Sequence, residues 1–144
     1  MLLAGLRLMH TFAGGAETTP AQWAEFRELG RLPGQQGTTA YGVICSGSPE
    51  TQTFEYMTGV EVASFDTVPP SLGRMRIHPQ RYAVFEHRAH VSTIWTTWKG
   101  IWHEWLPRSG HEGENAPDFE VYDERFDPTT GTGEIEVWFP VKVP

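Results

Sequence analysis

Cysteine is nearly absent from this sequence of 144 residues, in which Cys45 stands alone. A single cysteine cannot form an intrachain disulfide, and its scarcity is typical of proteins that work in a reducing compartment. No apolar run reaches the roughly 18 residues that a membrane span needs. The N-terminal residues 1–6 show neither a charged region nor a cleavage pattern, so no signal peptide is indicated. We therefore expect a soluble, cytoplasmic protein.

Basic residues are also few, since 11 Lys and Arg stand against 18 Asp and Glu and give a formal net charge of −7. Direct binding to nucleic acid or to an anionic membrane surface needs clustered positive charge, so we expect neither partner. A cationic ligand agrees with the sign of the net charge, although net charge steers an encounter and does not define a site.

Metal-binding and catalytic motifs are missing as well. Of the six histidines, His87 and His90 lie at the end of an expected strand, and His103 has no second histidine four residues on. Without a cysteine cluster, these spacings do not match zinc motifs. The sequence has no G-x-S-x-G, no phosphate-binding loop and no G-x-G-x-x-G. We expect no metal, no cofactor and no catalytic residue of these classes.

Aromatic residues, in contrast, are abundant: six Trp, eight Phe and four Tyr. Large aromatic side chains build cores and also line ligand pockets. The length is usual for one domain and is sufficient to bury a sizeable core. We expect residues 1–144 to form a single domain.

Hydrophobic spacing and turn residues predict two main helices and several strands. The first helix begins at Thr19, with Pro20 at its first position, and ends at Gly30. The second helix, over residues 93–106, has the one-sided apolar spacing of an amphipathic helix. The predicted strands cover residues 2–12, 39–45, 53–64, 72–78, 82–88, 119–124 and 134–143, with a bulge or bend near Gly59.

The order strand, helix, strand, strand occurs twice, over about 2–64 and 82–143. In a loose alignment of the two halves, residues 41–43 correspond to residues 119–121. Two such β-α-β-β repeats predict an α+β fold with one curved antiparallel sheet. Because the two helices cover one face of this sheet, we expect a ligand groove on the other face.

Several short motifs stand out in their order and spacing. They are YGV at 41–43, FEYMTGVEV at 54–62, RYAVFEHRA at 81–89, WLPRSG at 105–110, APDFEVY at 116–122 and EIEVWFPVKV at 134–143. Together they resemble the GyrI-like small-molecule-binding domain, which is also the effector-binding half of AraC-type and multidrug-sensing MerR-type regulators. The resemblance implies the paired β-α-β-β fold. In those regulators a helix-turn-helix region precedes the domain, and none precedes it here, so we expect a stand-alone form without a DNA-binding part.

Glu120 is the first candidate for a binding residue. Side chains alternate along a strand, so Glu120 and Tyr122 of the segment FEVYDE point to one face. Phe119 and Val121 point to the other face, and if they pack on the helices, Glu120 faces the seam between the repeats. There its counterpart, Gly42, would leave room for a ligand. The resemblance implies the same role, since this Glu is the acidic group at the floor of the family's drug pocket. A carboxylate in a poorly hydrated aromatic pocket favours a bound cation, and the alternative is a Glu on a solvated strand face.

Further pocket residues follow from motif positions and from the repeat, namely Trp105, Trp138, Met57, Tyr122, Tyr41 and Tyr56. The resemblance places Trp105 near the pocket. Trp138 and its counterpart Met57 would form adaptable walls, one a flat indole for cation–π contact and the other a flexible thioether. Alternation favours a core position for Tyr56. The apolar stripe of the second helix is also expected in the core, at Trp95, Trp98 and Trp102.

These observations lead to three hypotheses for the function. The first is a protein that binds a hydrophobic or aromatic, cationic, drug-like molecule and acts by sequestration or sensing. The second is a hydrolase of strained electrophilic rings, an activity of some proteins similar to this family, in which Glu120 would be catalytic with Glu55 or Glu136 as the second acid. The third is a protein that inhibits a basic partner such as DNA gyrase, from which the family takes its name. The sequence leaves both a monomer and a homodimer open.

Overall fold

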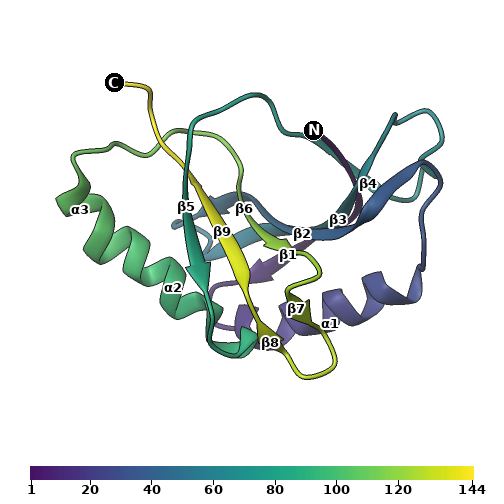
Figure 1. The fold of residues 1–144 in the computed structure, drawn as a ribbon, viewed down its shortest axis with the longest axis horizontal. Coiled ribbons are helices and arrows are strands. Elements are labelled where there is room, and N and C mark those ends of the chain that lie inside the picture. Colours follow the sequence, from purple (N-terminus) through teal and green to yellow (C-terminus); the bar gives the residue numbers. More distant parts are fainter.

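A computed structural model describes all 144 residues and contains one seven-stranded sheet with two main helices (Figure 1). The strands lie in the order β4-β1-β3-β2-β6-β9-β5, and all neighbouring pairs are antiparallel. Their bounds are β1 Leu2–Thr11, β2 Gln35–Ser48, β3 Thr53–Val62, β4 Gly73–Arg76, β5 Tyr82–His87, β6 Asp118–Tyr122 and β9 Ile135–Pro140. A separate hairpin is formed by β7 (Phe126–Asp127) and β8 (Thr132–Gly133). Each strand of the main sheet was predicted from the sequence.

The first helix, α1, covers Gly15–Glu28 and begins before the predicted start at Thr19. The hydroxyl group of Thr19 donates to the carbonyl oxygen of Gly15, so Thr19 supports the first turn from inside the helix and does not cap it. Pro20 also lies within the helix. The predicted end is confirmed, because Gly30 takes a φ of 66°, a conformation that favours glycine.

The second helix is composite. It runs from a 3₁₀ turn, η1 (Val91–Thr93), through α2 (Ile94–Gly100) and a π-helical turn, η2 (Ile101–Trp105), to α3 (Leu106–Ser109). The helix widens just before Pro107 because proline has no N–H for the carbonyl four residues earlier, and its ring clashes with that carbonyl. Gly110, with a φ of 76°, follows the last turn.

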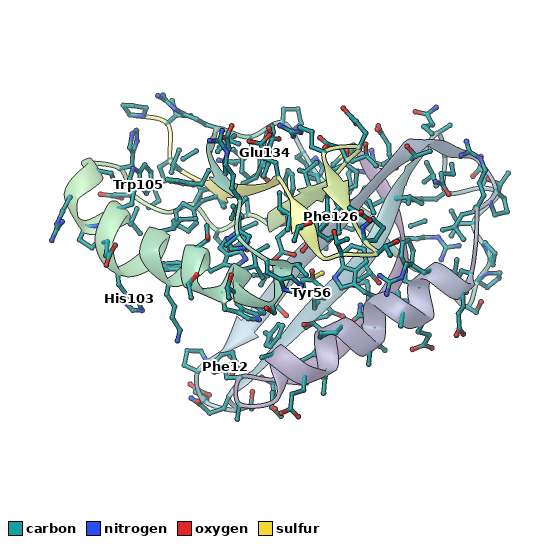
Figure 2. All side chains as sticks on the ribbon, turned by 60° about the horizontal axis from the view of Figure 1, so that its bottom comes forward. Phe12, Tyr56, His103, Trp105, Phe126 and Glu134 are labelled. Atoms are coloured by element: carbon teal, nitrogen blue, oxygen red, sulfur yellow. The ribbon has the colours of Figure 1, made fainter.

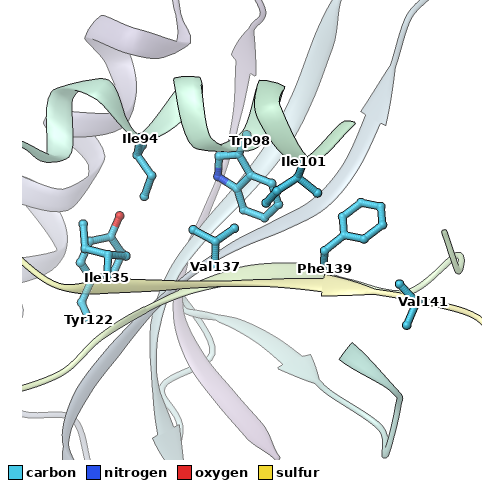
Figure 3. Packing of buried hydrophobic residues seen from close by; sticks show 8 residues of the cluster. All are labelled: Ile94, Trp98, Ile101, Tyr122, Ile135, Val137, Phe139 and Val141. Carbon is cyan, nitrogen blue, oxygen red and sulfur yellow. The ribbon is translucent and has the colours of Figure 1, made fainter. Parts of the chain in front are cut away.

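Both helices lie on one face of the sheet, as the strand register and the buried clusters show. Glu120 of β6 lies opposite Gly42 of β2 and Val137 of β9, so these residues share a face. The second helix packs on that face through the buried cluster Ile94, Trp98, Ile101, Tyr122, Ile135, Val137, Phe139 and Val141 (Figure 3). Phe26 of α1 packs beside it, in a cluster with Val60 of β3.

The opposite face of the sheet is buried too. It carries the cluster Leu3, Val43, Met57, Ile77, Phe119 and Val121. Ile77 comes from the segment that follows β4, and the half-buried Met75 and Trp138 pack around the same cluster. The sheet therefore has an apolar core on both faces, and only one of them is covered by helices.

The α+β class and the antiparallel sheet with two helices are confirmed. The strand order agrees with two β-α-β-β units that meet at β2 and β6, although the division at 2–64 and 82–143 stays a prediction. Of the bulge or bend predicted near Gly59, the bulge is wrong, because β1 and β3 pair there without a register shift and the irregularities lie in β2. No helix has both the length and the apolar character that crossing a bilayer requires.

Candidate ligand-binding site

Glu120 is an enclosed carboxylate near the centre of the sheet. It is 1% exposed and faces the helices. Its Oε1 accepts hydrogen bonds from the hydroxyl groups of Tyr56, at 2.6 Å, and Tyr122, at 2.7 Å. Its Oε2 accepts a hydrogen bond from the indole N–H of Trp98 at 2.9 Å. Donors from β3, β6 and the second helix therefore hold the carboxylate in one orientation.

No cation accompanies this carboxylate, since none of the ion pairs of the protein includes Glu120. Burial disfavours the charged form and raises the pKa of Glu120, while the three hydrogen bonds and the electrostatic influence of the His87 ring act in the opposite direction. The pKa values of Tyr56 and Tyr122 are raised well above the ordinary value, first by burial and then by the charge of Glu120. Both hydroxyl groups therefore stay protonated and act as donors.

Tyr56 reaches Glu120 because Gly42, the residue paired with Glu120 on β2, has no side chain. A Cβ atom at position 42 would lie 2.0 Å from the hydroxyl oxygen of Tyr56 and 2.6 Å from Oε1 of Glu120. The room that Gly42 leaves is therefore filled by the Tyr56 hydroxyl. It is not left for a ligand, as the sequence had led us to expect.

A cavity of about 540 Å³ lies beside this cluster. Glu120, Tyr56 and Tyr122 contribute to its lining, and its apolar walls come from both helices and β7, at Trp23, Phe26, Ile94, Trp95 and Phe126. The cavity thus lies on the helix face of the sheet. The predicted groove on the opposite face is corrected, because Glu120, and not Phe119, faces the helices.

Aromatic side chains surround the carboxylate on the cavity side. The indole N–H of Trp23 donates to the hydroxyl of Tyr56 at 3.2 Å. The rings of Trp23 and Tyr122 meet edge-on, with their centroids 4.8 Å apart, and Phe126 meets Tyr122 in the same way at 5.1 Å. Such walls offer flat apolar ligands a large contact area and can accept a cation over a ring face.

The other charged groups of the cavity lie toward its rim. Asp123 is paired with Arg125 at 2.7 Å, and the guanidinium lowers the pKa of Asp123. Glu124 is exposed, and Arg27 of α1 adds one positive charge to the lining. Glu120 is the only carboxylate of this cavity that is fully buried.

The structure brings two of the further predicted pocket residues to the cavity, Tyr56 and Tyr122. The predicted core position of Tyr56 is also confirmed, because this residue is 2% exposed. A buried Tyr lines the cavity through its hydroxyl end while its ring packs in the core, so both expectations are met by one side chain.

Three predicted pocket residues lie on the opposite face of the sheet, namely Tyr41, Met57 and Trp138. They belong to or pack on the cluster around Phe119, whose ring stacks on the indole of Trp138 with centroids 5.3 Å apart. The expectation that they share a pocket with Glu120 is therefore corrected. The reason is strand alternation, since these residues pair with neighbours that point away from the helices.

Trp105 also lies apart from the cavity. It is in the π-helical turn, where its ring meets Phe85 edge-on at 4.9 Å and stacks on His111 at 5.6 Å. In Figure 2, Trp105 lies near the end of the second helix that is remote from Tyr56. The binding role that the resemblance implies for Trp105 stays a prediction.

The two glutamates considered as a second acid are engaged elsewhere. Glu55 pairs with Arg7 at 2.6 Å, and Glu136 pairs with Arg125 at 3.2 Å. Neither residue lines the cavity that contains Glu120. No group of three potential metal ligands is present in the chain.

Sequence reasoning missed three aromatic or polar contributions to the site. Trp23 was assigned only to a helix, and Trp95, expected in the core, is half-buried and lines the cavity. Trp98 is buried as predicted, but its indole N–H also binds Glu120. Trp102 is 50% exposed and not in the core. The available signal was the need of a buried carboxylate for donors, which points to Trp and Tyr residues on the facing helix and strand.

Residues 1–142 match the family described as the GyrI-like small molecule binding domain. The transcriptional regulator BrlR of Pseudomonas aeruginosa is 32% identical over 103 residues, which are 71% of this chain and 37% of the regulator. The chain therefore spans little more than a third of the length of this curated relative.

Two solved structures share the fold. One is the structure of SAV2435 bound to tetraphenylphosphonium, with a TM-score of 0.70, 20% identity, and coverage of 99% of this chain and 88% of that chain. The other is an integron cassette protein of Vibrio cholerae, with a TM-score of 0.67, 16% identity, and coverage of 99% and 90%. At these identities the likeness concerns the fold alone.

Proposed function

This chain belongs to the GyrI-like small molecule binding domain family, and on that premise we propose that it binds a bulky aromatic cation in the cavity beside Glu120. The cavity of about 540 Å³ has the size of sites for drug-like molecules. Its ligand would lie between the two helices and contact Tyr56, Tyr122 and the walls of the cavity.

One observation carries the cationic part of this proposal: Glu120 is buried without a counter-cation next to an aromatic cavity. Burying an ionised carboxylate is costly, and the three hydrogen bonds to Glu120 offset only part of that cost. A cation in the cavity would offset more of it, whereas a neutral molecule of the same shape would not. The site would therefore select its ligand by charge as well as by shape.

Tetraphenylphosphonium, the ligand in the structure of SAV2435, is a cation of this kind and is a suitable first probe. In the cell, we propose that the protein acts by sequestering such molecules or by sensing them, without direct contact to nucleic acid. A hydrolytic function is less well supported, because Glu55 and Glu136 lie outside the cavity and are paired with arginines.

The test is a titration with tetraphenylphosphonium followed by tryptophan fluorescence, since Trp23 and Trp95 line the cavity. Wild type is expected to show saturable quenching. Glu120→Gln is a suitable partner variant because the amide keeps the shape and three contacts: its oxygen accepts from Trp98, and its NH₂ group donates to the tyrosine hydroxyl oxygens, which reverses the direction of those two hydrogen bonds. We expect this variant to fold normally and to bind at least tenfold more weakly, a difference of about 1.4 kcal/mol. Equal binding by both proteins would contradict the proposal.

A further inference from the structure

A second cavity adjoins the first on the helix face of the sheet. It has a volume of about 930 Å³ and shares Ala16 and Trp95 with the first cavity. Phe126, which lines the first cavity, and Phe12, which lines the second, lie on opposite sides of Tyr56 in Figure 2. The two spaces are therefore neighbours along the gap between the helices, with the Trp95 side chain at their common wall.

The second cavity offers broad apolar surfaces. Phe12 and Trp102 line it and are 46% and 50% exposed, which is unusual for side chains of this size. Phe54 lines the same cavity, with its ring centroid 6.1 Å from that of Phe12 and 5.7 Å from that of Trp95. An aromatic ligand that reached past Trp95 would thus find further aromatic surface.

Asp118 is a second carboxylate of β6 that has no ion-pair partner. It lies on β6 two residues before Glu120, so both side chains point to the helix face, and Asp118 lines the second cavity. Its carboxylate is in none of the ion pairs of the protein. Burial raises the pKa of Asp118 to about 7, and the charge of Glu120 acts in the same direction.

Two charged side chains besides Asp118 line this cavity, Lys99 of α2 and Glu114 of the loop before β6. No carboxylate lies within 4.0 Å of the Lys99 ammonium group, so Lys99 is not a counter-ion of Asp118. When Asp118 is ionised, the charges of the lining sum to one net negative charge, which suits a positively charged group.

We propose that the two cavities form one extended site for an elongated aromatic dication, in which Glu120 faces one positive centre and Asp118 the other. The inference rests on the proposed function of the first cavity and specifies its ligand class. Alternate residues of a strand are ~7 Å apart, and this spacing sets the separation of the two charges. A monocation would use only the Glu120 end of the site.

The test compares two probes with the same biaryl frame, 1-methyl-4-phenylpyridinium with one charge and 1,1′-dimethyl-4,4′-bipyridinium with two. Calorimetric titration of wild type is expected to give about tenfold tighter binding of the dication. In Asp118→Asn this advantage should disappear while the monocation affinity changes by less than about twofold. In Glu120→Gln both probes should bind more weakly.

The outcomes separate the two proposals. If Glu120→Gln weakens both probes but Asp118→Asn leaves the dication advantage in place or weakens both probes equally, the extended site is overturned and the proposed function stands. If Glu120→Gln changes neither probe, both proposals fall. Thermal unfolding checks that Asp118→Asn is folded. Lys99→Met, which keeps Asp118, supplies an independent check: it should tighten the dication more than the monocation, and an equal effect on both would count against the extended site.

Discussion

Gly42 lies directly opposite Glu120 in the antiparallel pair of β2 and β6, and the space above the glycine holds the Tyr56 hydroxyl that donates to Glu120 at 2.6 Å. Three residues from separate strands thus form one unit. A side chain at position 42 would collide with Tyr56 and would not reach a ligand in the cavity. The geometry of the carboxylate therefore depends on a residue that makes no contact with the cavity.

Gly42→Ala should destabilise the protein by about 1–3 kcal/mol, because the new methyl group forces Tyr56 and Glu120 to move. It should also weaken binding of aromatic cations. Gly47→Ala, on the same strand, is the matched control for stability and for monocation binding, since its Cβ would meet only Phe54 Cβ at 3.9 Å and Gly47 lines only the second cavity. Urea unfolding and cation titration of the two variants provide the check. Similar effects of both substitutions would show that position 42 has no special role.

Tyr56→Phe should cost about 1–3 kcal/mol of stability, because the indole N–H of Trp23 loses its acceptor and Glu120 loses a donor. With one donor fewer, the pKa of Glu120 should rise further and cation binding at neutral pH should weaken. Tyr41→Phe removes a hydroxyl from the opposite face and should leave binding unchanged. Thermal unfolding and fluorescence titration compare the two variants. Weaker binding in both would contradict a specific role of the Tyr56 hydroxyl.

The strands could be predicted because their alternating or continuous apolar patterns survive in the sequence, and the glycine ends of both helices follow from simple conformational rules. Which face of the sheet carries the cavity could not be predicted. Alternation along β6 separates Glu120 from Phe119, but it does not tell which of them faces the helices. Here both faces of the sheet are buried, one by the helices and one by the segment around Ile77, so apolar character gave no answer.

The site itself was predicted in part. Glu120 could be found from its motif and from its place in the repeat. Its donors could not, because Tyr56 and Trp98 come from a distant strand and a helix whose orientation only the folded chain defines. The start of the first helix was predicted wrongly for a local reason. Thr is a common N-cap residue, but the Thr19 hydroxyl donates instead to a backbone carbonyl within the helix.

Cation binding should weaken as the pH falls. Burial raises the pKa of Glu120, so its carboxylate becomes neutral at a higher pH than an exposed glutamate does, and the neutral form does not attract a cation. The nearby titratable groups are Tyr56, Tyr122, His87 and Asp118, and His90, Asp123 and Glu124 also line the cavity. The difference between wild type and Glu120→Gln therefore isolates the contribution of Glu120. The affinity of wild type should fall with decreasing pH more steeply than that of the variant. Parallel pH profiles would contradict this expectation.

Stability should show the opposite trend for the same group. A carboxyl whose pKa is higher in the folded state than in the unfolded state binds its proton more tightly when folded. The stabilisation is fully present below the ordinary pKa of 4.5 and is lost as the pH rises through the raised pKa of Glu120. Urea unfolding across this window should show that wild type loses stability with rising pH relative to Glu120→Gln. A constant difference between the two proteins would rule out a raised pKa.

The two faces of the sheet should differ in their response to substitution. Trp95→Ala removes a wall that both cavities share, and we expect about tenfold weaker cation binding. Trp138→Phe alters the opposite face and should change the affinity by less than about twofold. Calorimetric titration distinguishes the cases. A larger effect of Trp138→Phe would show that the ligand binds on the opposite face of the sheet, as first expected from the sequence.

The most direct measurement is a calorimetric cycle with N-methylacridinium and acridine, a cation and its uncharged analogue, on wild type and Glu120→Gln at a pH where acridine is neutral. If the buried carboxylate selects positive charge, the variant loses at least tenfold in affinity for the cation, about 1.4 kcal/mol, and binds the neutral analogue as wild type does. If the variant loses affinity for both ligands equally, or for neither, Glu120 serves the fold and not the choice of ligand.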